Sequence, residues 1–147
     1  MSDTYTTPEE IVDAILDELG TDIVVGTPLG IGKANRVLNE LVERALDDPE
    51  ISLSIWTALT LSKPEPESEL ERRLLEPIAD RLFGAYPNLR YAELLDEETL
   101  PENIEVHQFY FPPGRHMGNP TAQQAHHSVN YTHALRAFRE AEPNLLL

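Results

Sequence analysis

A glycine-rich segment at residues 26–33 lies between an apolar run and a predicted helix. Glycines let the backbone approach a ligand closely, and the N-terminus of the following helix favours negative charge. The segment ends in Gly32 and Lys33, as a phosphate-binding loop does. However, the Walker spacing requires glycine at position 27, where the chain has Thr27, and Ala34 replaces the hydroxyl residue that binds magnesium. The dinucleotide fingerprint is also absent. Two interpretations stay open, a structural tight turn and a ligand-binding loop.

All the histidines of the chain fall in one stretch, residues 107–133. They are His107, His116, His126, His127 and His133. Their spacing matches no structural zinc pattern, the chain has no cysteine, and no His-Glu-x-x-His motif occurs. Neutral hydrogen-bonding side chains share the stretch, as in a pocket for a small polar acid. These are Asn119, Gln123, Gln124, Asn130 and Tyr131. We therefore expect no metal site, but histidines that line a polar pocket or lie on the surface.

These two segments lie within an alternating series of predicted helices and strands. The first helix is predicted to have Thr7 as its cap and Pro8 in its first turn, with Glu10 completing a Thr-x-x-Glu capping box, and to end at Gly20. Residues 22–25 are a short buried strand that enters the glycine-rich segment. The next helix has an apolar stripe at helical spacing and stops at residues 47–49.

A second strand is predicted at residues 51–61 and a break at residues 63–67. Ser68 can then cap a helix that Pro77 should kink. Its expected core face consists of Leu70, Leu74, Leu75, Ile78 and Leu82. One short helix is expected within residues 86–103. The third strand is predicted at residues 104–111, and a helical region that breaks near Asn130 follows at residues 119–140.

This alternation predicts one α/β domain over residues 1–147, with a doubly wound, mainly parallel sheet and helices on both faces. Parallel strands place the loops that leave them at one edge, so residues 26–35 and 112–124 should lie at the same edge. The final residues, 144–147, have the pattern of a strand that is beginning. We therefore expect a fragment that is truncated at its carboxyl end.

The charge balance excludes some partners. The chain has 26 acidic and 11 basic residues, a net charge of −15, and no cluster of cations that could neutralise phosphates of a nucleic acid.

The first residues do not form a secretory signal, and no apolar run reaches the roughly 20 residues of a membrane span. We expect a cytoplasmic protein without membrane contact. Its acidic, lysine-poor composition suits a salt-rich cytoplasm, with an ordinary acidic bacterial protein as the alternative.

Five segments in collinear order resemble the amino-terminal region of the acetyl-CoA hydrolase and CoA-transferase family. They are residues 26–35, 53–61, 70–77, 118–124 and 128–133. The resemblance implies a CoA-transferase-like amino-terminal domain. It also implies chemistry in which a glutamate attacks an acyl-CoA thioester, after which a short carboxylate or water accepts the acyl group. That glutamate belongs to the family's carboxyl-terminal half, so no catalytic residue is assigned here and the chain alone should be inactive.

By this resemblance the chain helps to enclose the acyl group of acetyl-CoA or another short-chain acyl-CoA. Coenzyme A would be a thioester substrate and no cofactor would be tightly bound. The expected partners are the missing carboxyl-terminal half and, as an open option, a second copy in a homodimer. The expected substrate-binding residues are Gly26, Pro28, Gly30, Gly32, Lys33, Asn35, Asn119, Gln123, Asn130 and His133. Transferase and hydrolase activity are not distinguished. The alternatives are a phosphate- or nucleotide-binding module and a non-enzymatic interaction domain.

Overall fold

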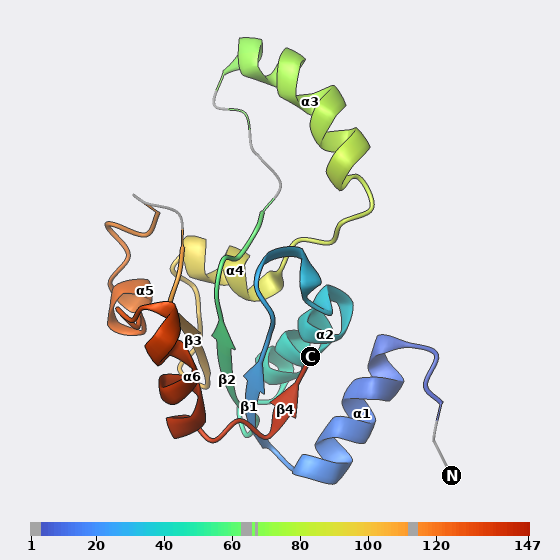
Figure 1. The fold of residues 1–147 in the computed structure, drawn as a ribbon. Helices are drawn as coiled ribbons and strands as arrows, with labels where there is room; N and C mark the ends of the chain where they lie inside the picture. The colour runs from blue at the N-terminus through green and yellow to red at the C-terminus, as the bar shows by residue number, and fades with distance from the viewer. Residues whose placement is uncertain (1–3, 63–65, 67, 112–114) are drawn as a thin grey trace.

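A four-stranded, all-parallel sheet organises the computed structural model, which describes residues 4–62, 66, 68–111 and 115–147 (Figure 1). Its strand order is β3-β2-β1-β4. The strands are β1 (Asp22–Gly26), β2 (Ser52–Thr57), β3 (Ile104–Gln108) and β4 (Leu145–Leu146). Helices lie on both faces of the sheet, so the predicted doubly wound α/β fold is confirmed.

The strand order determines which helix covers which face. Helices α2 (Asn35–Asp47) and α4 (Arg90–Asp96) connect β1 to β2 to β3, moving in one direction across the sheet. The chain then returns past β1 to reach β4. Because parallel crossovers are right-handed, the reversal places α6 (Tyr131–Glu140) on the opposite face. The short helix α5 (Pro120–Gln124) lies beside the end of β3 (Figure 1).

The hydrophobic core lies on one face of the sheet, which we call the closed face. Alternate strand residues point into it and meet α1 (Pro8–Leu19), α2 and α4. The strand residues of the closed face are Ile23, Val25, Leu53, Ile55, Ile104 and Val106. The intervening residues point to the other side, which we call the α6 face. They are Val24, Gly26, Ser54, Trp56, Glu105 and His107.

Several local predictions are confirmed. Thr7 and Glu10 form the capping box of α1, and Pro8 is its first residue. Ser68 caps α3 (Glu69–Phe83) by accepting a hydrogen bond from the backbone of Glu71. The predicted helical region after residue 119 breaks before Asn130 and forms α5 and α6.

The predicted core face of α3 is wrong. Helix α3 has no buried residue, and Leu70 and Leu82 are 79% and 68% exposed. The helix continues through Pro77 and extends away from the sheet (Figure 1), which leaves most of its apolar stripe exposed. Amphipathic spacing shows that a helix has an apolar side, but it does not show what covers that side.

Two strands are shorter than predicted. Strand β2 ends at Thr57, two residues before Leu59 adopts a positive φ of 49°, and β3 ends at Gln108. Residues 63–65, 67 and 112–114 lie outside the described residues. They include most of the predicted break after the second strand and the start of the predicted loop at 112–124. Within the described part of the chain, no helix has the length and apolar character that a membrane span requires.

Candidate functional site

A cavity of about 360 Å³ lies at the carboxyl ends of β1 and β2, beside β4. Here the strand order reverses between β1 and β4, and such switch points are where open parallel sheets bind ligands. The lining is mainly apolar. It consists of Gly26, Thr27, Pro28, Trp56, Thr57, Phe109, His127, Val129, Ala134, Leu135, Ala137, Phe138, Leu146 and Leu147.

Gly26 allows α6 to cover this cavity. A Cβ atom at position 26 would clash with Cζ of the Phe138 ring, at a separation that non-bonded carbon atoms essentially never show. The glycine therefore gives the Phe138 ring room to lie directly on β1. The absent Cβ atom of Gly26 thus makes room for a side chain of the same protein, at the wall of the cavity.

Three aromatic rings form a cluster at the other wall of the cavity, which we call the Trp56 cluster. The rings of His107 and His127 each lie 4.5 Å from the Trp56 ring, measured between centroids. Nδ1 of His107 lies 3.1 Å from Nε2 of His127, and Nε2 of His107 lies 3.1 Å from a carboxylate oxygen of Glu105. Carboxylate and two imidazoles thus form a hydrogen-bonded chain that ends at the cavity.

The hydrogen bonds determine the tautomers of the neutral rings. An ionised Glu105 only accepts, so His107 donates from Nε2 and its Nδ1 accepts from Nε2 of His127. His127 then carries its lone pair on Nδ1. Burial lowers the pKa of His127 below its usual value, and the nearby His107 and His126 lower it further. His127 is therefore neutral at pH 7.

Lys33 joins the loops that follow β1 and β2. Its side chain is buried, and its Nζ donates to the carbonyl oxygens of Gly30 (3.3 Å), Ala58 (3.0 Å) and Leu59 (3.4 Å). An ammonium group has three N–H donors, so these carbonyls use all of them. Burial lowers the pKa of Lys33 to about 8. The geometry makes Lys33 a tie between two loops and leaves no N–H for a ligand.

Asn35 and Lys33 border a second hollow of about 340 Å³, beside the start of α2. The Nδ2 atom of Asn35 donates to the carbonyl oxygen of Pro87 at 2.8 Å. Within the described chain, Oδ1 of Asn35 and the hydroxyl of Tyr86 are buried without a hydrogen-bond partner. The expected site residues of the glycine-rich segment are therefore divided. Gly26 and Pro28 line the cavity, Lys33 and Asn35 line the second hollow, and Gly30 and Gly32 line neither.

The expected site residues after β3 lie outside both spaces. Asn119 is buried and caps α5, accepting from the backbone N–H of Ala122 at 2.9 Å and donating to the carbonyl of Leu95 at 2.5 Å. Gln123 donates to the carbonyls of His116 and Met117. Asn130 is exposed and caps α6, and His133 is exposed on that helix. These contacts position the backbone.

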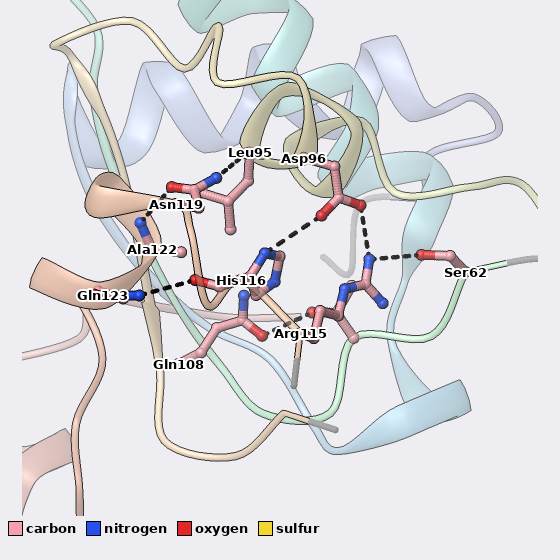
Figure 2. A network of polar contacts seen from close by, with 10 residues as sticks. Ser62, Leu95, Asp96, Gln108, Arg115, His116, Asn119, Ala122 and Gln123 are labelled. Atoms are coloured by element: carbon pink, nitrogen blue, oxygen red, sulfur yellow. Dashed lines mark hydrogen bonds and ion pairs between the residues drawn. The ribbon is translucent and has the colours of Figure 1, made fainter. Parts of the chain in front are cut away.

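Figure 2 shows how the loops after β2 and β3 are held to α4. The carboxylate of Asp96 accepts from Nη2 of Arg115 at 2.7 Å and lies 3.4 Å from Nδ1 of His116. The same Arg115 nitrogen donates to the hydroxyl of Ser62 at 3.2 Å. Burial lowers the pKa of His116, which Asp96 partly offsets. This network joins the loops after β2 and β3 to the end of α4, and none of its residues lines the cavity.

Three lining residues are absent from the expected substrate-binding set: Trp56, His127 and Phe138. Of these, the sequence singles out only His127, as one of the histidines expected in a polar pocket or on the surface. Trp56 alternates with Ile55 near the end of a strand, so strand periodicity could have placed it opposite the core. No such signal brings His127 and Phe138 to β1 and β2, because their contacts depend on the return of the chain to β4. No metal-binding group of three or more His, Cys, Asp or Glu side chains occurs among the described residues.

Comparison with known proteins adds no assignment to this geometry. No protein-family model, curated protein or solved structure matches the chain.

Proposed function

We propose that this chain is the amino-terminal, acyl-binding part of a CoA-transferase or acyl-CoA hydrolase that acts on acetyl-CoA or another short-chain acyl-CoA. The observation that carries the proposal is the mainly apolar cavity of about 360 Å³ at the switch point of the sheet. Its volume is at the lower end of the range for small-molecule sites. The collinear resemblance of five segments to the family supports the same conclusion.

The lining favours an acyl chain over a phosphate group. Each methylene that leaves water for such a cavity contributes about 0.8 kcal/mol. A phosphate requires cations or several N–H donors, and no Lys or Arg of the described residues lines the cavity. Lys33, the cation of the glycine-rich segment, has its donors occupied by three carbonyls. The acyl interpretation therefore explains the site better than the nucleotide-binding alternative.

Trp56 allows a direct test of binding. It is the chain's one tryptophan and lines the cavity, so its fluorescence should change saturably when butyrate or butyryl-CoA is added. Magnesium-ATP should produce no saturable change. Ala137→Leu, which fills part of the cavity, should weaken acyl binding at least fivefold. Leu74→Ala on α3 is the matched control and should leave binding unchanged. Saturable ATP binding, or no acyl binding to the folded chain, would contradict the proposal.

Activity is expected only with the carboxyl-terminal half. The chain has no glutamate in the family's nucleophile motif, so the isolated chain should not hydrolyse acetyl-CoA above the background rate. A thiol-release assay checks this. Turnover that disappears when a glutamate of this chain is changed to glutamine would show that the chain carries its own nucleophile.

A further inference from the structure

The cavity has a polar end whose arrangement suggests the chemistry of its ligand. Trp56, His107 and His127 stack at one wall, and His127 lines the cavity directly. Nε2 of His127 is engaged by His107, and Nδ1 has no hydrogen-bond partner among the described residues. A ligand with an apolar chain would therefore meet, at the imidazole of His127, a ring nitrogen that the described residues leave without a hydrogen-bond partner.

We propose that the Trp56 cluster binds the carboxyl group of a short-chain acid together with one proton, which the acid and His127 share. The proposal rests on the proposed function and deepens it, because it names the free carboxylic acid, the acyl acceptor or product, as a ligand of the cavity.

The charges around His127 require this proton. No Lys or Arg of the described residues lines the cavity, so a bare carboxylate would enter without a countercharge. The titratable groups near His127 are Glu105, His107 and His126. Of these, Glu105 repels an anion, so the proposal assigns the compensating charge to a proton at His127. An imidazolium over the indole face of Trp56 also gains a cation–π attraction.

The hydrogen bonds that link His127 through His107 to Glu105 also favour a proton on His127. When His127 takes up a proton, Nε2 still donates to His107, which still donates to Glu105. Only Nδ1 of His127 changes, from acceptor to donor. The cluster can therefore bind the proton without losing a hydrogen bond, and the new donor is available to the carboxylate.

Binding of the acid should follow pH with a defined sign. Burial and neighbouring histidines lower the pKa of His127 below its usual value, so its free imidazole is mostly neutral at pH 7 and binding takes up one proton. Affinity for a carboxylate should then fall about tenfold for each pH unit above the pKa of the free His127, and level off below it. A neutral ligand of the same length should bind with no such dependence.

The experiment uses butyrate and 1-butanol as probes, with Trp56 fluorescence as the readout from pH 5.5 to 8.5. Butyrate affinity should follow the tenfold slope, and butanol affinity should be constant. Calorimetry at pH 7.5 in buffers of different ionisation enthalpy should show uptake of about one proton per butyrate. His127→Phe keeps an aromatic ring beside Trp56 but should remove the slope and weaken butyrate binding more than tenfold at pH 6. His133→Phe, at an exposed position of α6, is the control and should behave as wild type.

Butanol binding also reports whether the His127→Phe variant folds and keeps its cavity. Butyrate binding without a pH slope, or a slope that persists in His127→Phe, would overturn this proposal and leave the acyl cavity intact. If the wild-type chain bound neither butyrate nor butanol, the proposed function would be rejected, and this inference with it.

Discussion

The two faces of the sheet differ in how they are covered. On the closed face, α2 buries Leu38, Leu41, Val42 and Ala45 against strand residues that are themselves almost fully buried. On the α6 face, helix α6 has no buried residue although its apolar residues also recur at helical spacing. One face is a packed core, and the other encloses a cavity with histidines at its wall.

The difference shows that amphipathic helices of similar pattern can have opposite roles. A packed face stabilises the folded state because it removes apolar area from water. A cavity instead leaves apolar area that a ligand can cover. We therefore expect the closed face to contribute most of the stability, whereas the proposed function assigns the α6 face to ligand binding. The following substitutions test this division, beginning with the largest expected effect.

The strongest test compares one leucine from each face. Leu41→Ala removes a side chain that is fully buried in α2 and should lower the free energy of unfolding by about 2–5 kcal/mol. Leu135→Ala, at a residue of α6 that is 57% exposed, should cost less than about 1 kcal/mol. Urea unfolding of both variants gives the comparison. Equal losses would show that the α6 face is packed as tightly as the closed face.

Lys33 lies at the edge where both faces end, and its protonation should affect stability. Its pKa of about 8 in the folded chain is lower than the value of about 10.4 in the unfolded chain. Between these values the unfolded state holds more protons, so the free energy of unfolding should rise with pH, by about 3 kcal/mol in total. Unfolding at pH 7.5 and pH 10.5 measures the rise, and Lys33→Met should abolish it. A wild-type chain that follows the variant at both pH values would show that Lys33 titrates normally.

The two asparagine caps, Asn119 and Asn130, should differ in how much stability they contribute, with the larger loss at the buried Asn119. Asn119→Ala removes a cap and a buried hydrogen bond to Leu95, and should cost about 1–3 kcal/mol. Asn130→Ala removes only the exposed cap of α6, at about 0.5–1 kcal/mol. Melting temperatures of the two variants rank the effects. A larger loss for Asn130→Ala would mean that α6 contributes more to stability than its exposure indicates.

The smallest effect is expected on α3. Leu74→Ala changes a side chain that is 67% exposed and should alter the free energy of unfolding by less than about 0.5 kcal/mol. If α3 packed in a core, as its pattern predicted, the same change would cost at least about 2 kcal/mol. The measured change in the free energy of unfolding therefore distinguishes an exposed α3 from an α3 that packs in a core.

The sequence was sufficient where structure is local. The Thr7 capping box, the Ser68 cap and the short strand at residues 22–25 all depend on neighbours within a few positions. The parallel α/β class followed from alternation of elements. Strand ends were less predictable, because Thr57 is followed by apolar residues that leave the sheet through a residue with positive φ.

The candidate site could be predicted only in part. Gly26 and Pro28 do line the cavity, because they follow a strand at its carboxyl end. Asn119 and Gln123 attract attention as polar residues, but their side chains satisfy nearby backbone groups instead of facing a ligand. His127 becomes a site residue through its contacts with Trp56 and His107 on separate strands, and composition does not reveal which histidine reaches them.

The position of β4 has a consequence for folding kinetics. Thr27 and Thr57, at the ends of β1 and β2, bond across 30 residues, whereas Asn144 reaches Val24 across 120. Closing the longer loop costs more chain entropy, so the β1-α2-β2 unit should form before β4 docks. Two strand pairs, Val25 with Leu145 and Gly26 with Leu146, then join β4 to β1, together with the hydrogen bonds of Asn144. Backbone amides of α6 should consequently exchange with solvent faster than those of α2. With this folding order the cavity forms only when β4 docks, and we expect the detachment of α6 that begins unfolding to open the same cavity to a ligand.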